Sequence, residues 1–233
     1  MNVTTTLITK KETGKNMVGV IYLPKGTGKN DIKFFDAIVY GVPVEVRAGK
    51  KIISQDRWNK LLEKNLVNEK DLCELEFSGC TFENVSFEGL SLYNVTFKGC
   101  NFLTCSFDKS RLNDCLFVDC ELEACSFNQG AYYIDCKNCH FLNCSFLESC
   151  MGTSHFDKCR LVTCEFLLAS IRRGSFFQCE LEHPNFSHAT LDGIYFHGCT
   201  IPNAVYDNIY ITMGGATSEE VNRYQNSVLG CFS

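Results

Sequence analysis

The residues with the clearest chemical potential form the string Cys136-Lys137-Asn138-Cys139-His140, which matches the attachment pattern of a c-type haem. Two carboxylate pairs, Glu121/Glu123 and Glu180/Glu182, could mimic the acid and the nucleophile of a glycosidase. The chain also has 16 cysteines and 5 histidines, which are common metal ligands. Whether these groups can act depends on the elements that carry them and on the direction of each side chain.

A large apolar residue recurs at every fifth position over most of the chain. The first run of these centre positions is Leu72, Phe77, Phe82, Phe87, Leu92, Phe97, Phe102, Phe107, Leu112, Phe117, Leu122 and Phe127. The second run, one residue out of phase, is Cys136, Phe141, Phe146, Met151, Phe156, Leu161, Phe166, Ile171, Phe176, Leu181, Phe186, Leu191, Phe196, Ile201, Tyr206 and Ile211. A helix repeats every 3.6 residues and a strand every two, so this chain must turn a corner every five residues.

A second period of twenty residues lies within the first. Most cysteines stand two residues before a centre, at Cys80, Cys100, Cys105, Cys115, Cys120, Cys125, Cys139, Cys144, Cys159, Cys164, Cys179 and Cys199. Like residues spaced by twenty predict a solenoid with four sides per coil, in which each coil contacts only its neighbours. About seven coils rising ~4.8 Å each would make a rod ~34 Å long. The single step of nineteen, from Cys120 to Cys139, predicts one missing corner residue near 130–133.

This register argues against the chemistry considered first. Cys136 is a centre and Cys139 belongs to the cysteine column, so both should point inward, away from haem or metal. The columnar cysteines are interpreted as small buried hydrophobes, and a rung spacing of ~4.8 Å exceeds the Cβ–Cβ distance of a disulfide. A regular rod offers no cleft around the glutamate pairs, and no histidine has a triad spacing. We therefore expect no catalytic residue, no metal and no cofactor.

Strings such as Cys100-Asn101-Phe102-Leu103-Thr104 and Cys144-Ser145-Phe146-Leu147-Glu148 resemble the pentapeptide-repeat family, whose repeat is small–polar–Leu/Phe–X–X. The resemblance covers residues 72–212, about three fifths of the chain. It implies a mainly β fold, a right-handed quadrilateral β-helix with the centre and the residue two before it inward and the other three positions outward. The chain departs from the family in preferring Cys to Ala and Phe to Leu.

The flanks lack the period, so three parts are predicted: a small α+β domain over 1–70, the solenoid over 71–212 and a helical tail over 213–233. Strands are expected over 17–23, 37–40 and 42–46, a loop over 25–30 and a helix over 54–63. Thr217 to Glu220 resembles a capping box. In the helix that follows, Val221, Tyr224 and Val228 share one face. They could plug the end of the solenoid or form a homodimer contact, as in the quinolone-resistance members of the family.

Outward positions should be polar, and a few are not. Leu142, Leu147, Val162, Leu167 and Leu168 lie on two adjacent sides in the middle coils, with Leu103 on the same side as Leu142. A contiguous exposed apolar patch usually marks an interface, unless another part of the chain covers it.

Charge is unevenly distributed. The net charge is −5 overall, with +6 over residues 1–70 and −10 over 71–212. This balance gives no general attraction for nucleic acid. The absence of a long apolar run predicts no membrane span, and the absence of a Sec-type signal favours the cytoplasm, with non-Sec secretion into a host cell left open.

Three functions remain. The favoured one is a non-catalytic protein–protein interaction scaffold anchored by the apolar patch. The second is an acidic mimic of DNA that binds DNA gyrase, a role implied by the resemblance. Its phosphate-like carboxylates would be Glu83, Glu88, Asp108, Glu123, Glu148, Glu165, Glu182 and Asp207. The third is a bacterial effector that acts as an adaptor in host cells, because some effectors share this layout.

Overall fold

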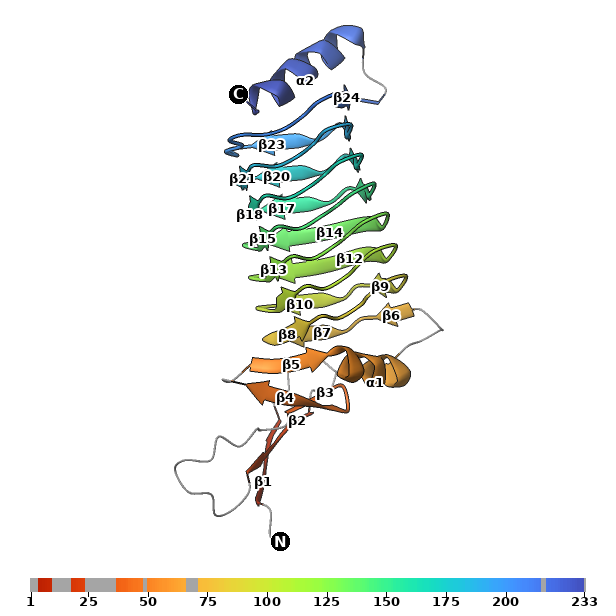
Figure 1. Cartoon of the computed structure of the whole chain (residues 1–233), viewed down its shortest axis with the longest axis vertical. Coiled ribbons are helices and arrows are strands. Elements are labelled where there is room, and N and C mark those ends of the chain that lie inside the picture. The colour runs from red at the N-terminus through yellow and green to blue at the C-terminus, as the bar shows by residue number, and fades with distance from the viewer. Residues whose placement is uncertain are drawn as a thin grey trace.

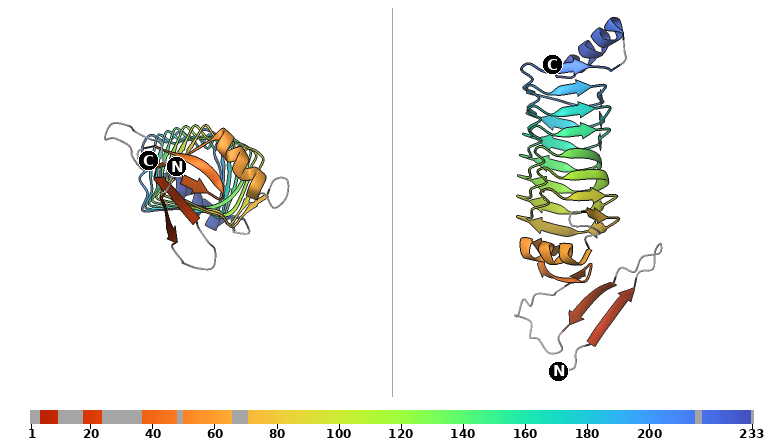
Figure 2. Two further views of the ribbon diagram at one scale, coloured as in Figure 1. Left: turned by 90° about the horizontal axis from the view of Figure 1, so that it is seen from below. Right: turned by 90° about the vertical axis from the view of Figure 1, so that its right-hand side faces the viewer.

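The computed structural model describes residues 4–9, 18–23, 37–47, 50–65, 71–214 and 217–232. It is a straight rod of stacked coils with a helix at each end (Figure 1). Seen along its axis, the rod has a four-sided outline (Figure 2). The predicted β-solenoid of about seven coils is confirmed, and its parallel strands pair coil on coil. Neither described helix is long and apolar enough to cross a membrane.

The N-terminal elements precede the first coil. They are β1 (Thr4–Thr9), β2 (Val18–Leu23), β3 (Ala37–Val39), β4 (Val42–Arg47), β5 (Lys50–Ser54) and α1 (Gln55–Asn65). β1 and β2 form an antiparallel pair, as do β3 and β4 and then β4 and β5. Strands were predicted at β2, β3 and β4 and a helix at α1. The loop predicted over 25–30 lies outside the described residues.

β3, β4 and β5 share a sheet with the rod, and together with α1 they share its core, whereas β1 and β2 form a sheet of their own. β5 pairs in parallel with β8 (Cys80–Glu83), which places Ile53 beside Phe82. Trp58 of α1 is fully buried, and its ring lies 4.5 Å from that of Phe87 between centroids. The helix therefore closes the open end of the solenoid, and the boundary predicted at residue 70 separates elements that share one core.

Two sides of the rod form one 13-stranded sheet. Side 1 contains β6 (Asp71–Cys73), β9 (Ser91–Tyr93), β16 (Cys150–Gly152), β19 (Ser170–Arg172), β22 (Thr190–Asp192) and β24 (Tyr210–Thr212). Side 2 contains β7 (Glu76–Ser78), β10 (Thr96–Lys98), β17 (His155–Asp157), β20 (Ser175–Phe177) and β23 (Tyr195–His197). Two longer strands, β12 (Arg111–Val118) and β14 (Ala131–Lys137), run along both sides and join them.

The other two sides are separate. Side 3 contains β8, β11 (Asn101–Leu103), β13 (Glu121–Glu123), β15 (His140–Leu142), β18 (Arg160–Val162) and β21 (Glu180–Glu182), and β5, β4 and β3 extend its sheet. Side 4 is held by single bridges between coils, such as Ser106 to Ser126 and Ser145 to Glu165. Sides 3 and 4 are adjacent along the chain and carry most of the outward residues singled out above.

The corners explain the period of five. The residue two after nearly every centre adopts a left-handed conformation, for example Asn84 (φ 53°), Gly89 (φ 68°) and Leu168 (φ 59°). Glycine and asparagine reach this region at low cost, whereas leucine does not. The missing residue lies where predicted: Asp114 at the corner of β12 has no counterpart in β14, which pairs Asn113 with Tyr133 and Cys115 with Ile134.

The interior follows the predicted register. Stacked aromatic rings fill side 4, with Phe107 and Phe127 centroids 4.6 Å apart. Tyr132 lies between the two runs of centres, five residues after Phe127, and is fully buried like a centre. Its hydroxyl donates to the carbonyl of Phe107 at 2.9 Å. A Cβ at Gly130 would lie 2.0 Å from that hydroxyl, so the large centre requires glycine at the small position.

Helix α2 (Ser218–Gly230) closes the C-terminal end. The predicted capping box is present. The side chain of Thr217 accepts from the backbone amide of Glu220, and the carboxylate of Glu220 accepts from the backbone amide of Thr217. Tyr224 and Val228 are buried against the last coil, and Val221 is half-buried. Tyr206, an expected inward centre, is 38% exposed because Phe232 stacks on Phe186 instead.

Candidate interaction surface

The predicted apolar residues lie together on sides 3 and 4. Leu142 of β15 and Val162 of β18 are register partners on adjacent coils of side 3. Leu147 and Leu167 each directly follow a centre on side 4 and lie on adjacent coils, where the amide of Glu148 donates to the carbonyl of Leu167 at 3.0 Å. All four are half-buried, and the neighbouring corner residue Leu168 is 49% exposed. We call these five residues the apolar patch; whether it binds a partner stays a prediction.

Leu103 is not part of the patch. Glu123 of β13 lies between the two leucines on side 3, paired with Leu103 on one edge and Leu142 on the other. The carboxylate of Glu123 therefore interrupts the apolar column and borders the patch on the side of the N-terminal coils.

The two leucines of side 4 replace a polar ladder. One coil below, the side chain of Asp108 accepts from the amide of Asn128 at 2.7 Å, and that of Asn128 accepts from the amide of Leu147 at 2.9 Å. The ladder resumes above the patch, where the hydroxyl of Ser187 accepts from the amide of Asp207 at 3.2 Å. Leucine has no acceptor, so Leu147 cannot cap the amide of Leu167, which forgoes a hydrogen bond worth about 1 kcal/mol. The amide of Ser187, next to Leu167, donates to the side chain of Asn185 at 3.0 Å instead.

Leu168 has a second local cost. Its φ of 59° lies in the left-handed region, which is unfavourable for a non-glycine residue by about 1–2 kcal/mol. Gly89 and Gln129 hold the same corner in lower coils and His188 holds it in the coil above. Other corners of side 4 adopt the same conformation, Lys109 and Glu148 among them, so the distinguishing feature of Leu168 is its side chain. An apolar side chain that is 49% exposed contributes little to the fold of its own chain.

The predicted acidic residues surround the patch on the same two sides. Glu83, Glu123 and Glu182 lie on side 3; Glu88, Asp108, Glu148, Glu165 and Asp207 lie on side 4. Several already have partners. Glu88 pairs with Lys109 at 3.1 Å, Glu182 with Arg160 at 2.9 Å, and Glu83 with Arg47 at 3.5 Å.

Both carboxylate pairs lie on the outer surface of side 3. Glu121 and Glu123 point outward from β13, and Arg160 binds both Glu180 (3.1 Å) and Glu182 (2.9 Å) from the coil below. Within the described residues no group of three or more His, Cys, Asp or Glu could hold a metal ion. Cys136 and Cys139 both point inward, as the register predicts.

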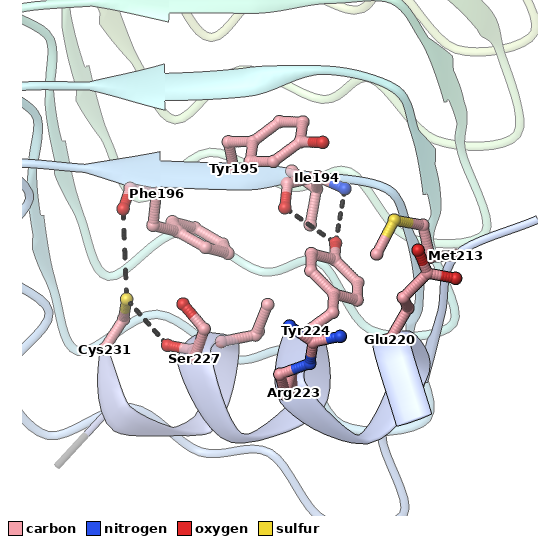
Figure 3. Close-up of a pocket in the computed structure, with 10 residues that line it drawn as sticks. Ile194, Tyr195, Phe196, Met213, Glu220, Arg223, Tyr224, Ser227 and Cys231 are labelled. Carbon is pink, nitrogen blue, oxygen red and sulfur yellow. Dashed lines mark hydrogen bonds between the residues drawn. The ribbon is translucent and has the colours of Figure 1, made fainter. Parts of the chain in front are cut away.

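Two hollows border the ends of the rod. One lies beside Ile52 and Arg57 of the N-terminal segment. The other, of about 380 Å³, lies between α2 and β23 (Figure 3). There Tyr224 points from the helix to Ile194, whose amide donates to the tyrosine oxygen and whose carbonyl accepts from the hydroxyl at 2.6 Å. Two roles were predicted for α2, a plug over the end of the solenoid and a homodimer contact, and this contact favours the first. A dimer through Tyr224 or Val228 would require the helix to leave its site.

A family model described as pentapeptide repeats matches residues 71–102 with 8 copies. Residues 71–102 of the chain are thus pentapeptide repeats. The same five-residue register continues in the structure through the last coil, well beyond the matched residues.

Solved structures of other proteins with pentapeptide repeats are similar to this one. QnrB1, described as a plasmid-mediated fluoroquinolone resistance protein, is 16% identical; the match covers 68% of this chain and 99% of that one, with a TM-score of 0.28. HetL from Nostoc sp. strain PCC 7120, described as involved in heterocyst differentiation regulation, is 14% identical over 66% and 78%, with a TM-score of 0.32. Rfr23 from Cyanothece 51142 is 12% identical over 65% and 95%, with a TM-score of 0.27. A comparison with curated proteins finds no sequence match.

Cysteine at the small position of the repeat has a physical reason. From Cys100 onward, each columnar thiol points at the carbonyl of a centre residue in the preceding coil, as Cys120 does to Phe97 at 3.3 Å and Cys105 to Phe82 at 3.3 Å. Cysteine therefore fills the space of a small hydrophobe and also satisfies a buried carbonyl, which alanine cannot do. Burial raises the pKa of Cys115 to about 12, so at neutral pH this group is a thiol and not a nucleophilic thiolate.

Some exposed aromatic residues were not singled out from the sequence. Tyr195 and Tyr210 precede centres in the last coil and are 60% and 62% exposed, and Phe177 stacks on His197 with centroids 5.2 Å apart. The five-residue period places all four side chains outward. The search that found the leucines at outward positions would therefore also have found Phe177, Tyr195 and Tyr210.

Proposed function

We propose that this pentapeptide-repeat chain is a non-catalytic scaffold that binds a protein partner through the apolar patch. The observation that carries the proposal is that apolar side chains with exposed surface lie together on two adjacent outer sides of the rod, at positions where most coils have polar residues. Leu147 interrupts an amide-capping ladder, and Leu168 is a 49% exposed leucine at a corner. Apolar residues with a local cost and exposed surface are expected where another protein covers them.

The charges around the patch favour a particular partner. Glu123, Glu148 and Glu165 border the patch, and none of them has an ion pair within the described residues. Acidic rims attract complementary basic surfaces and speed encounter at low salt. The partner surface should therefore have an apolar centre with lysine or arginine at its rim.

The test compares recovery of partners by three proteins from the same cell extract at two salt concentrations. The first is the natural chain, and the second carries Leu147→Glu and Leu167→Glu. The control carries Ser170→Glu and Thr190→Glu, which add the same two charges to paired positions on side 1. The proposal requires one protein that the natural chain and the control recover, that the patch variant loses, and whose recovery falls with salt.

One result would contradict the proposal: equal recovery of every protein by the patch variant and the natural chain, with unchanged hydrodynamic mass. Loss of the β circular dichroism signal would show that the patch variant does not fold. In that case Leu147→Asn replaces the double variant, because asparagine restores the acceptor of the polar ladder and supports the fold.

A second candidate, mimicry of DNA toward DNA gyrase, is favoured by the net charge of −10 over residues 71–212 and by carboxylates along two adjacent sides. A supercoiling titration at two salt concentrations tests it. Salt-sensitive inhibition at low protein concentration that is lost in Glu148→Gln plus Glu165→Gln would support mimicry. No inhibition would exclude gyrase as the partner and leave the scaffold proposal standing.

A further inference from the structure

The thiols of side 3 form a ladder with a regular hydrogen-bond pattern. From Cys100 onward, each donates to the carbonyl of the side 2 centre in the preceding coil, at 3.2–3.4 Å. The last of these in the repeat is Cys199, whose sulfur lies 3.2 Å from the carbonyl oxygen of Phe176. The next carbonyl in the column belongs to Phe196, since β20 and β23 pair Phe176 with Phe196.

Cys231 of the tail takes the next place in this ladder. Its sulfur lies 3.9 Å from the carbonyl oxygen of Phe196 and 3.3 Å from that of Ser227 (Figure 3). The following residue, Phe232, likewise extends the aromatic stack of side 4. The cover thus supplies a thiol and an aromatic ring where a further coil would place them. The carbonyls that Cys199 and Cys231 contact belong to paired strands, so the two carbonyls lie about one rung, ~4.8 Å, apart.

Only this pair of ladder thiols can close the remaining distance. A disulfide requires the two Cβ atoms to approach to 3.5–4.5 Å, and paired strands hold the other rungs at a fixed, longer spacing. Cys231 is instead the C-cap of α2, where no strand holds the backbone. Its contact with Phe196 is also the longest of the series. Cys199 and Cys231 are both half-buried, so solvent reaches them, whereas the other ladder thiols are buried.

We propose that Cys199 and Cys231 form a reversible disulfide that locks helix α2 onto the last coil. The oxidant is a small disulfide such as oxidised glutathione. One cysteine thiolate attacks it, forms a mixed disulfide and releases one glutathione thiol; the second cysteine then displaces the other. The two protein thiols lose two protons and two electrons in total, and the glutathione disulfide becomes two glutathione thiols.

The thiols should react slowly at neutral pH. A hydrogen bond with Cys179 and burial raise the pKa of Cys199, and burial raises the pKa of Cys231. Thiolate is the attacking species, so oxidation should be carried out at a pH of about 8.5. Reduction by dithiothreitol should reverse it.

Peptide mapping of the full chain tests the pairing directly. The protein carries Cys150→Ser, which removes an exposed thiol on side 1 that could join two molecules. After oxidation and tryptic digestion without reductant, residues 174–223 and 224–233 should be recovered as one linked species. The link should disappear in Cys199→Ser and in Cys231→Ser. It should persist in Cys179→Ala, which removes the other cysteine of the longer peptide.

The effect of the disulfide on the attachment of α2 is measured on the native protein. Oxidation should raise the Tm by about 5 °C and slow tryptic cleavage after Arg223, which is exposed on α2, by tenfold or more. Both effects should vanish in Cys231→Ser. Separate peptides that carry only glutathione adducts, a Cys231-dependent link between two molecules, or a link without any effect on Arg223 cleavage would each overturn the proposal.

Discussion

Phe232 stacks on Phe186, with ring centroids 5.4 Å apart and planes 15° from parallel. The periodic sequence assigns that place to Tyr206, whose ring lies beside that of Phe232 at 5.2 Å instead. A residue from a helix thus completes a stack built by strands. The end of the solenoid is covered by side chains that imitate another coil, which protects the exposed strand edges of the last one.

Phe232→Ala should remove this cover. Truncating a buried phenylalanine costs about 3–5 kcal/mol, and freeing α2 would expose the edge of β23. We expect a lower midpoint in urea unfolding and concentration-dependent self-association in light scattering. Leu229→Ala, on the exposed face of the same helix, is the control and should change neither. A Phe232→Ala protein that stays monomeric with an unchanged midpoint would show that α2 is not a cover.

Leu168→Gly should stabilise the chain and weaken the proposed partner binding. Glycine tolerates a φ of 59°, so relief of strain should add about 1 kcal/mol to the free energy of unfolding in urea. His188→Gly relieves the same corner one coil higher without loss of apolar surface, and should stabilise without affecting binding. A destabilised Leu168→Gly protein would mean that the leucine supports its own fold.

Gly130→Ala should be strongly destabilising, because the added Cβ would meet the ring and hydroxyl of Tyr132 and the carbonyl of Ser110. The expected loss is about 2–4 kcal/mol. Tyr132→Leu restores the usual pairing of a small residue with an aliphatic centre. The glycine substitution should therefore cost less in the Tyr132→Leu background, and a double-mutant cycle in urea measures the difference. Strict additivity would contradict the proposed fit.

Stability should fall in mild alkali. Burial raises the pKa of Cys115 from its ordinary value of 9.0 to about 12, so the unfolded thiol loses its proton first as the pH rises. The free energy of unfolding is therefore fully retained below pH 9 and decreases by about 1.4 kcal/mol per pH unit above it for this group. Cys115→Val, which copies Val95 one coil below, should reduce the slope by that amount in urea unfolding at a series of pH values. An unchanged slope would mean that a group other than Cys115 causes the loss of stability in alkali.

The five-residue period by itself predicted the solenoid, the inward cysteines and phenylalanines, and the corner with one residue missing. Each repeat contacts only its neighbours, so local sequence determines the position of each side chain in the rod. The outward direction of Leu147 and Leu167 follows from the same rule, as does the inward direction of Cys136 and Cys139.

The tertiary structure decided what happens where the period stops. No periodic rule places β5 beside β8, Trp58 over Phe87, or Phe232 over Phe186, because these contacts join segments without a shared repeat. The structure also revealed that the side chain of Asn128 accepts from the amide of Leu147, a hydrogen bond that Leu147 cannot offer to the next coil. Such contacts depend on which coils lie next to each other and on how the two ends of the stack are closed, and both are consequences of packing in three dimensions.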